Sequence, residues 1–358
     1  MLRRSICPLG KRYLVPKSYR GLYFWFVSST VAPMTFHPFR SLALIVLSLA
    51  ALSGAIPNAQ ADSHAGAANE MDTLVSAKWL HQHLDDPDLV VLDCTVMVEA
   101  DEQGELRTSS GRPNYEAGHI PGAGFADLMG ELSDTESPLE FTLPTPEEFV
   151  AAMSALGVSD NSRVVLYSAN YPAWAARVWW MLRWIGFDRA ALLDGGLAAW
   201  AAADYPLSTE SPRRAAGKLS LNLRPELIAD RDEVLESLKD QDVRLIDSMS
   251  EAHYRGEVAM YDRPGHIPGA SNIPTTLLMD ETGRFRPQDE LEMLFDLDAN
   301  DRKITYCGGG IAASANAFVL HRLGFTNVAV YAASLDEWAA DPANPMELGE
   351  ESGKYDKD

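Results

Sequence analysis

The same order of motifs occurs twice in this sequence, and that internal repeat constrains the fold more than any other feature. AGHIPGAGFADLM at 117–129 returns as PGHIPGASNIPTTLLM at 264–279, which places His119 and His266 147 residues apart. Each copy follows a short apolar run, LVVLDC at 89–94 and VRLIDS at 243–248. Because matching blocks keep one order at offsets of about 138 to 154 residues, the chain is predicted to hold two homologous domains.

Within each repeat, short β-branched runs alternate with longer helical patterns. RVVLYSAN at 163–170 and KITYCGGG at 303–310 each lead into a helical segment, and ALLDGGLAAW at 191–200 corresponds to AVYAASLDEW at 329–338. Such alternation is typical of βαβ units on a parallel sheet. The sequence therefore predicts an α/β fold in which each of two tandem domains is a parallel sheet flanked by helices.

Changes in composition predict the domain boundaries. The segment DYPLSTESPRRAAGKLSLNLRP is rich in Pro, Ser and charge, which is typical of a linker. A helix is expected to begin after Thr145, where Pro146 and Glu148 complete the pattern of a capping box. The predicted organisation is a leader and signal peptide at 1–61, an N-terminal domain at 72–205, a linker at 206–225, a C-terminal domain at 226–345 and a polar tail at 346–358.

The first 61 residues differ in charge from the rest, with seven Lys or Arg and no Asp or Glu. After Arg40, an apolar segment from Leu42 to Leu52 precedes AQA at 59–61, the layout of a secretory signal with a small-residue cleavage site. The apolar run is shorter than the ~20 residues that a membrane-spanning helix needs, and an uncleaved anchor is the alternative. We expect a periplasmic or secreted protein, detached from the membrane after cleavage, with Met34 as an alternative start to Met1.

Charge and cysteine content exclude several classes of function. Without the leader, 23 basic and 51 acidic side chains remain, a net charge of −28. Such a surface repels nucleic acid and anionic lipid, and a small anionic substrate needs a local basic patch. The mature chain keeps two cysteines, Cys94 and Cys307, and nothing resembles a metal-binding pair or a disulfide framework. No metal, cofactor or nucleic-acid partner is predicted, and the sequence leaves the oligomeric state open.

The strongest chemical signal is Cys307 at the start of a triple-glycine loop. In ITYCGGGIAAS at 304–314, it follows a strand pattern and precedes a helix expected to begin between Ile311 and Ala313. A helix N-terminus favours the charged form of a thiol, and glycines let backbone N–H groups curve around an anion. Cys307 is therefore predicted to be the catalytic nucleophile, and a structural cysteine beside a flexible turn is the alternative. The predicted substrate-binding backbone comprises Gly308, Gly309, Gly310, Ile311 and Ala312.

Together, the repeat and this cysteine resemble the two-domain rhodanese-like sulfurtransferases, the group that includes thiosulfate and 3-mercaptopyruvate sulfurtransferases. The motifs YEAGHIPGA, YRGE, RPGHIPGA, ITYCGGGIAAS and SLDEW carry the resemblance, which covers about Leu74 to Met346. It implies that sulfane sulfur passes from a small anionic donor, through a Cys307 persulfide, to a thiophilic acceptor such as cyanide or a thiol. It also places Arg255 and Arg263 against the anionic end of the donor, although either can instead form a surface salt bridge.

The first repeat lacks the features of the Cys307 loop. Its corresponding segment, YSANYPAWAAR, has Ser168 in place of the cysteine and no glycines. The first domain is therefore expected to be catalytically silent and, as in the resembling enzymes, to provide one wall of the site. A related Cys-loop chemistry, phosphate-ester cleavage, needs an Arg six residues after the cysteine. That position is Ala313, which excludes a phosphatase.

Several other residues are candidates for supporting roles. His119 and His266 are expected mainly to lock their Gly-His-Ile-Pro-Gly turns. In resembling mercaptopyruvate enzymes a first-domain His belongs to a relay that ends on a Ser two residues after the catalytic Cys, a position that is Gly309 here. The remaining candidates are Asp247, expected to accept backbone N–H groups as its counterpart Asp93 does; Trp338, a pocket wall or a core residue; and Cys94, expected to be a buried thiol.

The donor and the mode of action stay open at this stage. Thiosulfate-type relatives usually carry basic residues directly after the cysteine, and mercaptopyruvate-type relatives usually carry Gly then Ser. The sequence CGGG therefore favours 3-mercaptopyruvate, with thiosulfate as the alternative. Two functions of other classes are considered: a non-catalytic periplasmic sulfur carrier or persulfide-binding protein, and a redox-sensing thiol protein that would join Cys94 to Cys307.

Overall fold

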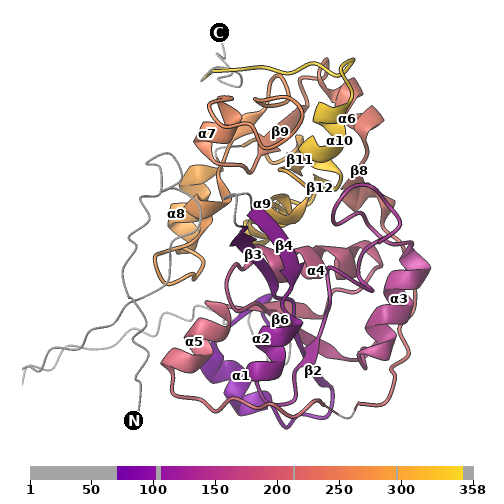
Figure 1. The fold of residues 1–358 in the computed structure, drawn as a ribbon, viewed down its shortest axis with the longest axis vertical. Helices are drawn as coiled ribbons and strands as arrows, with labels where there is room; N and C mark the ends of the chain where they lie inside the picture. Colours follow the sequence, from indigo (N-terminus) through magenta and orange to yellow (C-terminus); the bar gives the residue numbers. More distant parts are fainter. Residues whose placement is uncertain (1–70, 102–105, 213, 296, 350–358) are drawn as a thin grey trace, which may run out of the picture. The chain divides into compact units, whose positions relative to one another are not determined.

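The structure, a computed structural model, describes residues 71–101, 106–212, 214–295 and 297–349 (Figure 1). The predicted leader and signal peptide at 1–61 lie outside these residues, as does the polar tail from residue 350 onward. None of the helices within the described ranges is long and apolar enough to cross a membrane.

Two five-stranded sheets follow the two sequence repeats. The first has the order β1-β7-β6-β2-β5 and the second the order β10-β9-β11-β12-β8, and all neighbouring strands within them are parallel. When the second order is read from β8 to β10, each strand corresponds to the strand at the same place in the first sheet. This match confirms the predicted fold of two parallel-sheet domains. The strands of the first sheet are β1 (Leu74–Val75), β2 (Leu89–Asp93), β5 (Gly124–Phe125), β6 (Arg163–Tyr167) and β7 (Ala190–Leu193). Those of the second are β8 (Ile228–Ala229), β9 (Val243–Asp247), β10 (Ser271–Asn272), β11 (Arg302–Tyr306) and β12 (Val328–Tyr331).

Helices flank both sheets. In the first domain they are α1 (Ala77–His83), α2 (Arg112–Ala117), α3 (Pro146–Ala155), α4 (Ala173–Trp184) and α5 (Gly196–Ala202). In the second they are α6 (Arg231–Ser237), α7 (Glu251–Tyr254), α8 (Gln288–Leu294), α9 (Ile311–Arg322) and α10 (Ser334–Ala340), with short 3-10 turns at Pro225–Leu227 and Thr275–Leu278. The predicted capping box at the start of α3 is confirmed, because the Thr145 and Glu148 side chains each bond to the other residue's main chain.

The two sequence-matched long helices, α4 and α9, pack against each other and join the two repeats. Trp179 of α4 meets Phe318 of α9 edge-on, with 4.9 Å between ring centroids. His321 of α9 lies 5.3 Å from the same Trp179 ring. Both Trp179 and Phe318 are fully buried, and the aromatic segment of α4 therefore packs in the interior. Because the catalytic loop precedes α9, this contact brings the first domain to the candidate site.

The segment predicted as a linker is tied to the first domain by main-chain hydrogen bonds. Ser208 exchanges two bonds with His119, and the N–H of Asn222 donates to the carbonyl oxygen of Ile185. Further along, the N–H of Arg224 donates to Trp184 O. The segment therefore runs along the surface of the first domain, which explains its polar composition.

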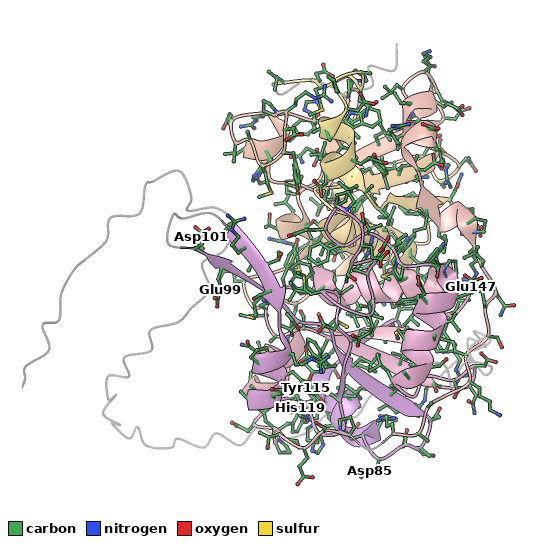
Figure 2. All side chains as sticks on the ribbon, turned by 45° about the vertical axis from the view of Figure 1, so that its right-hand side comes forward. Asp85, Glu99, Asp101, Tyr115, His119 and Glu147 are labelled. Carbon is green, nitrogen blue, oxygen red and sulfur yellow. The ribbon has the colours of Figure 1, made fainter. Side chains whose placement is uncertain are left out.

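Among the described residues, one element has no counterpart in the second repeat, an antiparallel hairpin of β3 (Val96–Ala100) and β4 (Leu106–Ser110). Figure 2 shows Glu99 and Asp101 on this hairpin, beside the body of the domain. The hydroxyl of Thr108 on β4 donates to the Glu140 carboxylate at 3.1 Å. The hairpin thereby reaches the loop around residue 140, which borders the Cys307 loop.

Candidate functional site

Cys307 lies at the junction of β11 and α9. The strand ends at Tyr306 and the helix begins at Ile311, as the sequence predicted. Gly310 is the N-cap residue of α9, and its φ of +79° lies in the left-handed region that favours glycine. Cys307 is 3% exposed, so the residue just before the N-terminus of α9 is shielded from bulk water.

Main-chain hydrogen bonds from the start of α10 hold the Cys307 loop. The N–H of Cys307 donates to the hydroxyl oxygen of Ser334 at 3.1 Å, and the N–H of Leu335 donates to the Cys307 carbonyl at 3.1 Å. The next N–H, of Asp336, donates to the Gly308 carbonyl at 2.9 Å. The motif SLDEW, which the resemblance singled out, thus supports the backbone of the nucleophile.

The first two glycines of the loop have different surroundings. A Cβ atom on Gly308 would collide with the hydroxyl of Tyr261. A Cβ on Gly309 would meet nothing closer than the Glu140 carbonyl oxygen at 3.6 Å, an ordinary van der Waals contact. A side chain at position 308 would therefore have to displace Tyr261, whereas position 309 has room for a small side chain.

Gly310 is constrained from two sides as well as by its backbone conformation. A Cβ there would lie 2.5 Å from the carbonyl oxygen of Ala332 and 2.7 Å from Nη1 of Arg177. Ala332 follows β12 of the same domain, but Arg177 belongs to α4 of the first domain. A first-domain guanidinium therefore reaches the turn that starts α9.

Arg177 is a site residue that the sequence reasoning missed. Its side chain is 1% exposed, and its Nη2 donates to the carbonyl oxygen of Phe141 at 2.8 Å. Burial lowers its pKa to about 10, and Cys307, when ionised, opposes that shift. The signal in the sequence was a single Arg inside the apolar run WAARVWW, which packing alone does not explain.

Acidic groups border the same loop. The carboxylate of Asp336 accepts the backbone N–H of Glu140, and its pKa is raised, mainly by burial and further by the charges of Glu140 and Asp262. Phe141, next to Glu140, has a φ of +56°, an uncommon conformation for a non-glycine residue. The neighbourhood of the loop therefore combines one buried cation with several carboxylates.

The two arginines predicted to bind the donor make other contacts. Arg255 ends α7 and its Nη2 pairs with the Glu251 carboxylate at 3.2 Å, one helical turn earlier. Arg263 donates through Nε and both Nη atoms, and its four acceptors are the carbonyl oxygens of Trp338, Ala339, Asp341 and Asn344 at 2.6 to 3.0 Å. These bonds hold the C-terminal end of α10 and the segment after it. Donor binding by either arginine stays a prediction.

Both histidines lie in their turns as buried, bonded residues. His119 Nδ1 is 2.7 Å from the Tyr115 carbonyl oxygen and its Nε2 is 3.1 Å from that of Glu210 (Figure 2 shows Tyr115 beside His119). His266 Nδ1 is 2.6 Å from the Tyr254 carbonyl oxygen, and its ring stacks on Tyr254. These contacts fit the turn-locking interpretation. A relay role for His119 stays a prediction that no contact to the Cys307 loop supports among the described residues.

Asp247 and Trp338 both lie in the interior of the second domain. Asp247 ends β9 and accepts the N–H of Met249 at 2.7 Å. Burial raises its pKa to about 7, against the lowering effect of bonds from Met249 and the Tyr306 side chain. Trp338 is fully buried and donates through Nε1 to the Pro345 carbonyl oxygen at 2.9 Å. It belongs to the core, the second of the two positions considered for it.

The first domain repeats the junction without a thiol. Ser168 occupies the position of Cys307, and its hydroxyl donates to the Tyr171 carbonyl at 2.7 Å. In this repeat Gly196 has the left-handed conformation that Ser334 adopts in the other. Cys94, after β2, is a buried free thiol, and Cys307 is also free.

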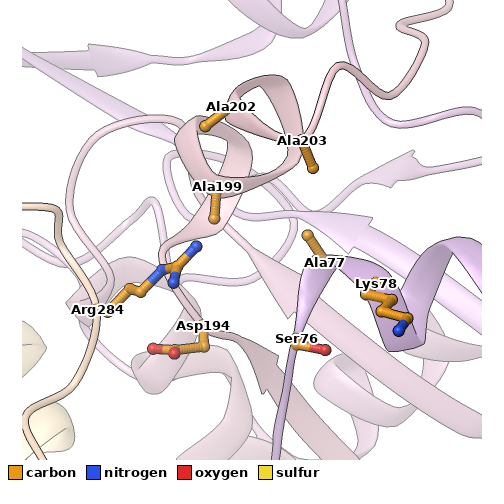
Figure 3. Close-up of a pocket in the computed structure, with 8 residues that line it drawn as sticks. All are labelled: Ser76, Ala77, Lys78, Asp194, Ala199, Ala202, Ala203 and Arg284. Atoms are coloured by element: carbon orange, nitrogen blue, oxygen red, sulfur yellow. The ribbon is translucent and has the colours of Figure 1, made fainter. Parts of the chain in front are cut away.

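A pocket of about 230 Å³ lies elsewhere, where the first domain meets the segment before α8 (Figure 3). Asp194 and Arg284 lie next to each other in its lining, and Cys307 is not among the lining residues. The Asp194 carboxylate accepts the N–H of Phe285 at 3.0 Å, a contact between the repeats. Within the described ranges, no group of His, Cys, Asp or Glu is arranged to hold a metal ion.

Comparison with known proteins identifies the family. The rhodanese-like domain model matches residues 76–203 and 230–341. The thiosulfate/3-mercaptopyruvate sulfurtransferase 2 of Arabidopsis thaliana is 34% identical over 77% of this chain and 86% of its own length. The sulfur carrier protein TtuD of Thermus thermophilus is 34% identical over 78% of this chain and 98% of its own length.

A solved structure agrees with these relatives. The 3-mercaptopyruvate sulfotransferase SseA from Escherichia coli superposes with a TM-score of 0.65 at 34% identity, covering 73% of this chain and 98% of the other. The fold, the position of Cys307 and the similarity to these relatives all indicate the same family. The chain belongs to the rhodanese-like family and is a two-domain sulfurtransferase.

Proposed function

We propose that the chain carries sulfane sulfur as a persulfide on Cys307, with 3-mercaptopyruvate as its preferred donor and a thiol as acceptor. The observation that carries this proposal is the junction itself. Cys307 lies between β11 and the N-terminus of α9, and its backbone is fixed by Ser334 and Leu335. The matching junction in the first domain has Ser168 instead, so the chemistry belongs to one domain.

The proposed reaction has two steps, transfer of sulfur to Cys307 and transfer from Cys307 to the acceptor. The Cys307 thiolate attacks the thiol sulfur of 3-mercaptopyruvate, forming a sulfur–sulfur bond as the donor's carbon–sulfur bond breaks. The electron pair of that bond stays with the donor carbon, which takes up a proton to become pyruvate. An acceptor thiolate then attacks the outer sulfur of the persulfide, forming an acceptor persulfide and releasing the Cys307 thiolate.

The charge around the loop supports the choice of donor. Thiosulfate carries two negative charges, whereas 3-mercaptopyruvate carries one when its thiol is protonated. Asp336 and Glu140 border the loop, and Gly308 and Gly309 supply no cationic side chain there. Like charges repel more strongly when the incoming ion carries two of them. The monoanion is therefore favoured, and thiosulfate is the weaker donor.

Steady-state kinetics with both donors test this proposal. We expect kcat/KM with 3-mercaptopyruvate to exceed that with thiosulfate at least about tenfold, the equivalent of ~1.4 kcal/mol in transition-state stabilisation. Cys307→Ser should abolish transfer from both, and Cys94→Ser serves as the matched control that keeps Cys307. A thiosulfate preference in the wild type would contradict the donor assignment but leave the persulfide chemistry intact.

A non-catalytic sulfur carrier is the second candidate, because the similar TtuD is named a sulfur carrier protein. A carrier would be loaded once by a donor and would release its sulfur only to a protein acceptor. Multiple turnovers with cyanide or a small thiol as acceptor would favour the enzyme. A single stoichiometric loading with no small-molecule turnover would favour the carrier.

We also propose that the chain is exported, because residues 1–61 combine a basic segment, an apolar run and AQA at 59–61. Expression of the full chain in a Gram-negative host tests this. A periplasmic product whose N-terminus is Asp62 is expected. A cytoplasmic product that keeps residues 34–61 would overturn it.

A further inference from the structure

We propose that Arg177, from the otherwise silent first domain, is the positive charge that stabilises the sulfur anion of Cys307. This inference rests on the proposed function, because it concerns the thiolate and persulfide states of that residue. In this role the Arg177 guanidinium, which borders Gly310 at the end of the loop, acts on the sulfur through their opposite charges. The first domain would thereby take part in the chemistry of the second.

The geometry of the guanidinium supports this role. Arg177 Nη2 donates to the Phe141 carbonyl oxygen, but Nη1 is buried and has no hydrogen-bond acceptor among the described residues. Nη1 is the atom that approaches Gly310, at 2.7 Å from the position of a Cβ there. The unused donors of this side chain are therefore next to the turn that carries Cys307 into α9.

The charge balance points the same way. Moving a guanidinium out of water is costly unless an anion accompanies it, and buried arginines are normally paired. None of the ion pairs between described residues supplies a carboxylate to Arg177, and Cys307, when ionised, is the group whose negative charge raises the pKa of Arg177. A thiolate or persulfide at position 307 would provide the missing anion.

A second donor on the same face of α4 strengthens the inference. Trp174 precedes Arg177 by three residues, so the two side chains lie on one face of the helix. The Trp174 ring is 5.4 Å from the Phe141 ring, and its buried Nε1 also has no acceptor in the described part of the chain. Two unsatisfied donors thus flank Phe141, whose side chain lies 3.9 Å from a Cβ position on Gly309.

A purely structural role for Arg177 is the competing explanation, since its Nη2 also supports Phe141. The two roles differ in the electrostatic potential that they create at the sulfur. Alkylation by iodoacetate, which is anionic, and by iodoacetamide, which is neutral, both require the thiolate. The ratio of the two rate constants therefore cancels the thiolate fraction and reports the local potential.

The experiment measures this ratio for Cys307 at one pH and low ionic strength, with the alkylated peptide identified by mass spectrometry. Arg177→Met should lower the iodoacetate-to-iodoacetamide ratio about tenfold, as expected for removing a charge at low effective dielectric. Arg177→Lys should restore it to within about twofold of the wild type. Arg183→Met is the matched control, because Arg183 lies on the same helix but pairs with Asp188 at 3.1 Å.

An unchanged ratio in a folded Arg177→Met protein would overturn the inference, as would an equal effect from Arg183→Met. If Arg177→Met fails to fold, Arg177→Gln takes its place, and a wild-type ratio no higher than that of the urea-unfolded chain would also overturn the inference. The same wild-type sample is tested for sulfur uptake from 3-mercaptopyruvate. No uptake refutes the proposed function, whereas uptake with an unchanged ratio refutes only the role of Arg177.

Discussion

The hydroxyl oxygen of Ser334 accepts the backbone N–H of Cys307 at 3.1 Å while Ser334 itself has a φ of +53°. The same hydroxyl donates to the Tyr331 carbonyl at 2.7 Å. In the first repeat the left-handed position is occupied by Gly196, which has no side chain to serve Ser168. A non-glycine residue in this conformation destabilises the folded state by about 1 kcal/mol or more. Such strain is retained where the side chain makes a functional contact.

Replacing Ser334 separates its two roles. Ser334→Ala removes the acceptor and keeps the backbone strain, so we expect it to destabilise the fold by about 1 to 3 kcal/mol and to slow sulfur transfer. Ser334→Gly also removes the acceptor but relieves the strain, so its loss of stability should be smaller. Urea unfolding and persulfide formation rates measure both. Equal stability of the two variants would show that the φ angle is not strained.

The three glycines should differ in their tolerance of alanine. Gly309→Ala should change the free energy of unfolding by less than about 0.5 kcal/mol, because its Cβ meets only van der Waals contacts. Gly308→Ala should cost about 1 kcal/mol by displacing the Tyr261 side chain. Gly310→Ala should cost at least about 2 kcal/mol, because it combines a positive φ with contacts to Ala332 and Arg177.

This ranking is checked by urea unfolding of the three single variants. A Gly308→Ala, Tyr261→Phe double variant supplies the control, because the cost of the alanine should fall when the hydroxyl is removed. A flat ranking, with the three alanines equivalent, would contradict the described loop geometry.

Much of this fold was predictable because the repeat marks equivalent elements twice. Apolar runs such as 89–93 and the glycines after Cys307 indicate buried strands and a tight strand-to-helix turn from local chemistry alone. The β3–β4 hairpin was not predicted, since β4 is mostly polar and the hairpin occurs in one repeat. The sequence alone also could not distinguish two roles for Arg263, binding the donor or donating hydrogen bonds to four carbonyl oxygens.

The contribution of Arg177 was beyond sequence reasoning for a different reason. Its neighbours Trp174, Trp179 and Trp180 form an apolar helical pattern that predicts packing, and packing is what they do. The contact between Arg177 and the Cys307 loop depends on how α4 meets α9. The lone Arg in an apolar run marks the residue as unusual, but a local pattern does not say which distant segment it contacts.

The buried carboxyl of Asp247 should make stability depend on pH. Burial raises its pKa to about 7, so the folded state binds the proton more tightly than the unfolded chain does. The stabilisation is therefore complete below pH ~4, the ordinary carboxyl range, and is lost as the pH rises through about 7. Asp247→Asn keeps an oxygen for the Met249 N–H but cannot ionise.

We therefore expect the stability of Asp247→Asn relative to the wild type to increase between pH 5 and pH 8, by about 2 to 4 kcal/mol. Urea unfolding at several pH values measures this difference. The variant Asp93→Asn, at the matching strand end of the first domain, provides the comparison. Parallel pH profiles for Asp247→Asn and the wild type would contradict the assignment.

The central claim, a persulfide on Cys307, is tested most directly by intact-mass measurement after incubation with 3-mercaptopyruvate and removal of excess donor. The account predicts that the wild type and Cys94→Ser gain the mass of one sulfur atom, that a thiol acceptor removes it, and that Cys307→Ser gains none. Sulfur bound to Cys307→Ser, or no gain by the wild type with either 3-mercaptopyruvate or thiosulfate, would contradict it.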